Sequence, residues 1–147
     1  MRNHREVMHT MTRREAREEA FLMLFEAAFQ PQKDPEEIYA LAVEVRDIPE
    51  NEYVRKVFFG VLGEREKLDE KIARHSNGWK PDRLSFAAIS VLRLSVYEML
   101  YSEDVPARVS LNEAIELIKK YDDPKARAFV NGVLNAIKDE IESGKDS

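Results

Sequence analysis

The chain has 147 residues, contains no cysteine and carries a formal net charge of −5. This length fits one domain that buries roughly two thirds of its unfolded surface, and the charge argues against general affinity for nucleic acids. The lack of cysteine excludes a disulfide framework and a thiolate zinc site, and no signal peptide is apparent, so we expect a cytoplasmic protein.

Positive charge is concentrated at the N-terminus. Residues 1–17 hold five arginines and two glutamates, a net charge of +3 that leaves −8 on the remainder. Residues 1–11 show no apolar period and are predicted to form a flexible basic arm. His4 and His9 in this arm have no third ligand nearby, so we predict no metal site. A basic end on an acidic body can bind one phosphate chain locally.

From Thr12, apolar residues recur at helical spacing and predict a first helix that ends at Pro31. Thr12 and Glu15 have the spacing of a capping box, which starts this helix at the arginines. Three arginines outside the apolar stripe occupy its first turns: Arg13, Arg14 and Arg17. Each opposes the helix macrodipole by a few tenths of a kcal/mol. Both a solvated turn and a phosphate contact stay open.

Asp34 and Pro35 signal a second, short helix that runs through Val45. Its expected inward residues are Ile38, Leu41, Ala42 and Val45. A longer helix follows, with helical spacing from Val54 to Ile72. Gly60 and Gly63 within it predict a close helix contact or a bend. Trp79, in the turn after this helix, is predicted either to cap the bundle or to face a partner.

The stretch Leu84–Tyr101 is apolar on all sides of a helical wheel, so it is predicted to be the central helix of a bundle. Its charges, Arg93 and Glu98, and its three internal serines make it too polar to cross a membrane.

Two amphipathic helices complete the pattern, from about Val109 to Tyr121 and from Lys125 to about Glu142. Their expected inward residues are Leu111, Ala114, Ile115 and Ile118 in the first, and Phe129, Val130, Val133, Leu134, Ile137 and Ile141 in the second. Residues 143–147 are predicted to be a disordered tail. No segment alternates with period two, so we predict an all-α, compact bundle of six to seven helices, with residues 12–142 as one domain.

No phosphate loop, nucleophile elbow, paired-histidine motif or calcium loop occurs, so we predict neither enzymatic activity nor a cofactor. Candidate contacts remain at the arginine cluster and in the segment KKYDDPKAR. The basic residues of that segment are Lys119, Lys120, Lys125 and Arg127. Phe129 lies beside it at the edge of the apolar stripe, and both a core role and a contact role stay open.

Four motifs carry a family resemblance, in this order: RREAREEAFLMLF at 13–25, VLRLSVYEML at 91–100, DVPARVSLNEAIELIKKY at 104–121 and ARAFVNGVLNAI at 126–137. Together they resemble the NusB family of bacterial antitermination factors. The resemblance implies two small helical subdomains and a non-enzymatic role. It also implies binding to the boxA element of ribosomal RNA leaders together with NusE, a small-subunit ribosomal protein, within the RNA polymerase antitermination complex.

The resemblance also assigns residues. Arg13, Arg14 and Arg17 match the family's N-terminal arginine motif and are expected to contact RNA, and Phe25 stands where tyrosine is common, so stacking is retained. Phe129 and Asn131 lie in the FVNG motif, next to the loop expected to contact RNA. Lys125 and Arg127 replace acidic or small polar residues, which adds positive charge. Ala88 and Ile89 depart from the family's Asp-Arg, so packing or partner contacts there are expected to differ.

These residues predict that the starts of the first and last helices form one surface for single-stranded RNA. A second hypothesis is an accessory NusB-like module associated with ribosomal RNA methylation. A third is a structural homodimer, which binding of boxA-type RNA distinguishes from the first.

Overall fold

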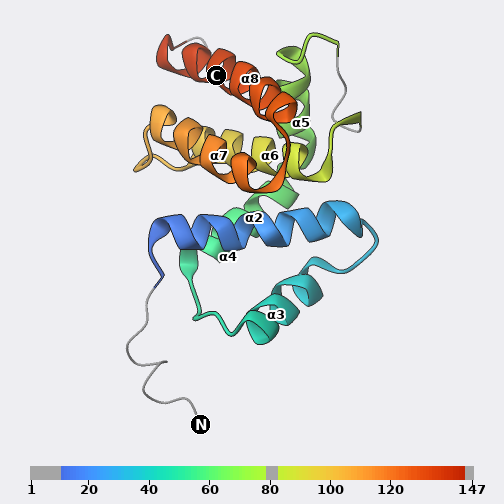
Figure 1. Ribbon diagram of the computed structural model, residues 1–147. Helices are drawn as coiled ribbons and strands as arrows, with labels where there is room; N and C mark the ends of the chain where they lie inside the picture. The colour runs from blue at the N-terminus through green and yellow to red at the C-terminus, as the bar shows by residue number, and fades with distance from the viewer. Residues whose placement is uncertain (1–10, 79–82, 145–147) are drawn as a thin grey trace. The chain divides into compact units, whose positions relative to one another are not determined.

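The computed structural model describes residues 11–78 and 83–144, and within these ranges the regular structure is helical, with no strand (Figure 1). The α-helices are α2 (Arg13–Phe29), α3 (Pro35–Arg46), α4 (Glu52–Gly63), α5 (Arg65–Arg74), α6 (Phe86–Tyr101), α7 (Ala107–Tyr121) and α8 (Pro124–Glu142). The all-α prediction is confirmed. The predictions for His4, His9, Trp79, the arm through residue 10 and the tail from residue 145 lie outside the described residues. No described helix is both long and apolar enough to cross a membrane.

Short-range capping explains where the helices begin. At α2 the predicted capping box is present: the Glu15 N–H donates to Thr12 Oγ1 at 3.0 Å, and the Thr12 N–H donates to Glu15 Oε1 at 2.9 Å. Asp34 caps α3 ahead of Pro35, as predicted. Asp123 caps α8 by accepting from the Ala126 N–H at 2.9 Å. Such caps satisfy backbone donors that have no partner inside the helix.

The chain divides into two compact units, one ending at Phe59 and the other beginning at Gly60. In the first unit α2 packs against α3, and Arg46 Nε donates to Glu19 Oε1 at 2.5 Å. Its buried apolar residues are Ala16, Ala20, Phe21, Met23, Leu24, Ile38, Tyr39, Ala42, Val54, Val57 and Phe58. The division fits the two subdomains that the family resemblance implies.

The predicted inner face of α3 is partly wrong. Leu41 and Val45 are 45% and 70% exposed, whereas Tyr39 is buried. The Tyr39 ring lies 5.5 Å from the Phe59 ring, between centroids, and its hydroxyl donates to Glu50 Oε2 at 3.2 Å. A tyrosine buries a large apolar ring when its polar tip finds a partner, and this rotates α3 toward Tyr39.

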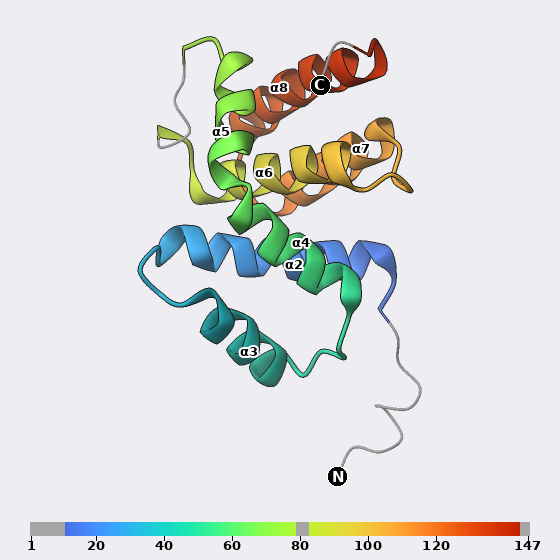
Figure 2. The ribbon, with the colours of Figure 1, turned by 180° about the vertical axis from the view of Figure 1, so that it is seen from behind.

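In the second unit α6 packs against α5, α7 and α8, and α5 is seen beside α6 and α8 from behind (Figure 2). Residues 87–99 are all buried except Arg93, so the predicted central helix is confirmed. Arg93 forms two 2.8 Å hydrogen bonds to Asp69, and the buried Glu98 accepts from Ser110 Oγ at 2.8 Å. Ala88 and Ile89 are 2% and 4% exposed, so both are buried.

The single long helix predicted from Val54 to Ile72 is instead two helices that meet at Glu64. The predicted close contact is present at Gly60, where an added Cβ atom would meet the Tyr97 hydroxyl group. Gly63, the last residue of α4, has open space around it. Glycine is a poor helix former, so the helix ends where two such residues lie close together.

Candidate nucleic-acid interface

The capping box makes Arg13 and Arg14 the first two residues of α2, and both are exposed. Arg17 lies one turn further and is only 3% exposed. The expectation that Arg17 stands outside the packed part of the helix is therefore wrong. Its guanidinium carbon lies 5.8 Å from the centroid of the Tyr53 ring, which belongs to α4 of the same unit. A substitution at Arg17 would therefore also change the packing of this unit.

Tyr53 is also the platform for Arg13. The Arg13 guanidinium carbon lies 4.4 Å from the Tyr53 ring centroid, within the range of a cation–π interaction. Asn51 fixes the start of α4 by accepting from the Val54 N–H at 3.0 Å. No sequence signal pointed to Tyr53, because forty residues separate it from Arg13 and no local spacing links the two.

Arg14 and Phe25 form a second pair on α2. They are eleven residues apart, about three helical turns, so both lie on one face roughly 16 Å from each other. Phe25 is 37% exposed, and its ring lies 6.3 Å from that of the buried Phe21. The face therefore offers a cation near the helix start and an aromatic ring further along.

The candidate residues of α8 lie on two flanks of its buried stripe. Lys125 and Phe129 are four residues apart and share one flank, whereas Arg127 and Asn131 share the other. Lys125 and Asn131 are exposed, and Arg127 and Phe129 are half-buried. The predicted inward residues Phe129 and Ile141 are thus only half-buried, while Val130, Val133, Leu134 and Ile137 form the core. The structure pairs Phe129 with Lys125 and separates it from Asn131.

A chain of hydrogen bonds fixes the start of α8. Ser85 Oγ caps α6 by accepting from the Ala88 N–H at 3.0 Å and donates to Asp122 Oδ2 at 2.5 Å. Asp122 Oδ1 accepts from the Asp123 N–H at 2.9 Å, and Asp123 caps α8. The loop before Lys125 is therefore joined to the start of α6. The sequence placed Asp122 and Asp123 only between the helix predicted to end at Tyr121 and the one predicted to begin at Lys125.

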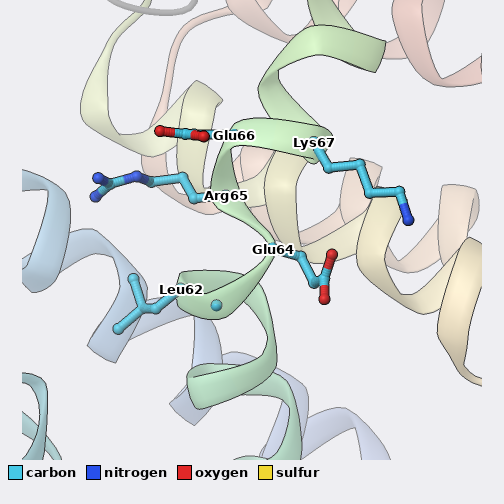
Figure 3. Close-up of a pocket in the computed structure, with 6 residues that line it drawn as sticks. Leu62, Glu64, Arg65, Glu66 and Lys67 are labelled. Atoms are coloured by element: carbon cyan, nitrogen blue, oxygen red, sulfur yellow. The ribbon is translucent and has the colours of Figure 1, made fainter.

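A hollow of about 370 Å³ opens at the break between α4 and α5, lined by residues Leu62 to Lys67. Arg65 and Glu66 point to one side of the ribbon, and Glu64 and Lys67 to the other (Figure 3). Side chains that diverge in this way do not converge on a ligand. Among the described residues, no three histidine, cysteine or acidic side chains are placed to hold a metal ion.

The fold and these helix starts define an all-α protein whose candidate contacts are basic and aromatic side chains. The model of the NusB family matches residues 14–139. The chain belongs to the NusB family.

Similar proteins cover nearly the whole chain. The transcription antitermination protein NusB of Bacillus pumilus is 44% identical over 131 residues, which cover 89% of this chain and 98% of the relative. The solved structure of T. maritima NusB has a TM-score of 0.82 at 32% identity, covering 90% and 94% of the two chains. A crystal structure of the antitermination factors NusB and NusE in complex with dsRNA gives a TM-score of 0.78 at 32% identity, with coverages of 86% and 96%.

Proposed function

We propose that the protein is a transcription antitermination factor that binds boxA-type leader RNA together with NusE, within the RNA polymerase antitermination complex. Membership of the NusB family and the solved relative that contains NusE and RNA support this proposal. The main geometric support for this function is that α2 and α8 each present a basic and an aromatic side chain on one helix face. Phosphate contacts combined with stacking on aromatic rings are how single strands are bound.

The residues divide by chemistry. Arg13, Arg14, Lys125 and Arg127 are proposed to contact phosphates, since a cationic side chain at the surface gains from an anion beside it. Phe25 and Phe129 are proposed to stack on bases, and Asn131 to hydrogen-bond to RNA. Arg17, which is buried, is proposed to support the same contact from within the unit.

The test is titration of labelled single-stranded boxA-type RNA, with NusE from the same organism, at several salt concentrations. Arg14→Ala and Lys125→Ala are each expected to weaken binding and to reduce the salt slope by somewhat less than one. Arg74→Ala is the matched control: it removes an exposed cation at the end of α5, which lies near the C-terminal part of α8 through the contact of Lys71 with Glu140. Equal losses in all three variants would show that only net charge matters.

Strand preference is tested by competition, because one solved relative contains double-stranded RNA. Unlabelled single-stranded boxA-type RNA is expected to compete better than a duplex of the same sequence, since paired bases cannot stack on Phe25 or Phe129. Equal competition would remove stacking from the proposal.

We also propose that the protein acts by binding, without catalysis, and in the cytoplasm, where bacterial transcripts are made. Cell fractionation that recovers the protein chiefly with membranes, or turnover of bound RNA by the purified protein, would contradict this.

A further inference from the structure

The exposed start of α2 and the first turn of α4 meet at one aromatic ring. Arg13, an exposed residue of α2, and Arg17, a buried one, both place their guanidinium groups within 6 Å of the Tyr53 ring centroid. Tyr53 itself is half-buried. The ring therefore lies between the packed interior of the unit and the surface at which Arg13 is exposed.

An arginine at a helix start has two disadvantages as a ligand contact. Its charge opposes the helix macrodipole, and its long side chain loses rotamer freedom when it is fixed by a ligand. A cation–π contact counters both, because the face of the ring attracts the guanidinium and restricts its position before any ligand arrives. Binding then costs less entropy, which is how preorganisation raises affinity.

The same geometry favours an anion. Two guanidinium groups lie around one ring at the helix start, and the planar guanidinium of the exposed one, Arg13, can bind phosphate oxygens through two parallel hydrogen bonds. Glu15, the acidic residue of the first turn of α2, accepts the Thr12 N–H within the capping box. The Tyr53 ring therefore fixes the orientation of the Arg13 guanidinium before an anion binds to it.

We infer that Tyr53 is a positioning residue for an RNA phosphate: its ring holds the Arg13 guanidinium in the direction from which it contacts a phosphodiester of the bound strand. This inference rests on the proposed function. It adds a residue that neither the sequence pattern nor the family motif indicated, and it gives Tyr53 no direct contact with RNA.

The test is a double-mutant cycle between Arg13 and Tyr53, read by titration of boxA-type RNA with NusE at several salt concentrations. Tyr53→Leu is expected to weaken binding about two- to fivefold, the range that a cation–π contact supplies. The salt slope is expected to stay unchanged, because the charge of Arg13 is still present. Tyr53→Phe retains the ring and is expected to bind as the unaltered protein does.

In an Arg13→Ala background, Tyr53→Leu is expected to weaken binding little further, because the group that it positions is gone. An equal loss with and without Arg13 overturns the inference, since the ring then acts on RNA directly or through the fold. Unchanged affinity in Tyr53→Leu, with weakened binding in Arg13→Ala, also overturns it and leaves the proposed function intact. Unchanged affinity in Arg13→Ala removes the phosphate contact itself.

A second measurement needs no substitution at Tyr53. In the NMR spectrum of the unaltered, RNA-free protein, the Arg13 Nε–Hε signal is expected to be shifted upfield by the ring and to be more ordered than that of the exposed Arg74. An Arg13 signal as mobile as that of Arg74 overturns the inference even if Tyr53→Leu fails to fold.

Discussion

The absence of a side chain at Gly60 lets the Tyr97 ring pack against the backbone of α4. A Cβ atom at Gly60 would collide with the Tyr97 hydroxyl oxygen and with the ring carbon that bears it. Tyr97 is buried, so the ring has little room to move. Gly60→Ala is expected to destabilise the protein by about 1–3 kcal/mol, the usual cost of overpacking.

Gly63→Ala is the matched control, because nothing lies within 4 Å of the position that its Cβ atom would take. It is expected to leave stability unchanged or to raise it by up to about 1 kcal/mol through helix propensity. Both variants are compared by urea unfolding. Equal stability of the two would show that the Tyr97 ring moves away at no cost.

Glu140 links α8 to α5 and gives the protein a pH-dependent contact. It accepts from Lys71 Nζ at 3.4 Å, and its other oxygen lies 3.2 Å from His75 Nε2, in a geometry too poor for a strong hydrogen bond. Burial raises the pKa of Glu140, but His75 and Lys71 together lower it by more than burial raises it, so the pKa of Glu140 lies below its ordinary value. A lowered pKa means that the folded state favours the ionised carboxylate.

The stability that Glu140 contributes is therefore fully present above the pKa of the unfolded chain and is lost as the pH falls through the lower pKa of the folded protein. Urea unfolding of the unaltered protein and of Glu140→Gln, from pH 5.5 to pH 3, measures this contribution. The difference in unfolding free energy is expected to shrink below about pH 4.5. A difference that grows on acidification would contradict the assigned direction.

Helical periodicity gave the correct buried surface for α6 and the wrong one for α3, for a physical reason. α6 is apolar on all sides and surrounded by α5, α7 and α8, so no choice of face was needed. On α3 two apolar stripes share Ile38 and Ala42, and periodicity alone cannot choose between them. The choice depends on Phe58 and Phe59, far along the chain, which pack against Tyr39.

The different positions of two leucines test this reading. Leu94 of α6 is 1% exposed and Leu41 of α3 is 45% exposed. Leu94→Ala is expected to cost about 2–5 kcal/mol of unfolding free energy, through lost burial and the cavity left behind. Leu41→Ala, the same chemical change at the surface, is expected to cost less than about 1 kcal/mol. Similar losses in chemical denaturation would show that α6 is not central or that Leu41 is buried.

In the candidate interface, features set by neighbouring residues were predictable from the sequence, whereas contacts between residues far apart in the chain were not. Thr12 and Glu15 are three residues apart, so the sequence located the start of α2 and the arginines on it. The position of the Arg13 side chain depends on Tyr53, and the start of α8 depends on Ser85, each about forty residues away along the chain. Such contacts form only in the folded unit, so the spacing of residues in the sequence did not reveal them.

The distribution of charge along the whole chain limits how RNA can be bound. The net charge is −5, yet residues 1–17 carry +3. An acidic body repels a polyanion, so the proposed RNA binding is expected to involve only a few phosphates. If three to five phosphates are neutralised, the logarithm of the affinity is expected to fall against the logarithm of salt concentration with a slope of roughly −2 to −4. A slope near zero, or one far steeper, would contradict a small phosphate-contacting surface.

Phe129 distinguishes stacking from electrostatic attraction in the same titration. Its ring is half-buried and shares a flank of α8 with Lys125, so it is placed to contact a base beside the phosphate that we propose Lys125 binds. Phe129→Ala is expected to weaken RNA binding by about 1–3 kcal/mol with the salt slope preserved, whereas Lys125→Ala reduces the slope. Thermal unfolding of both variants separates binding from packing. If the Phe129 ring serves only the core, its loss would lower the melting temperature and leave the RNA affinity of the folded protein unchanged.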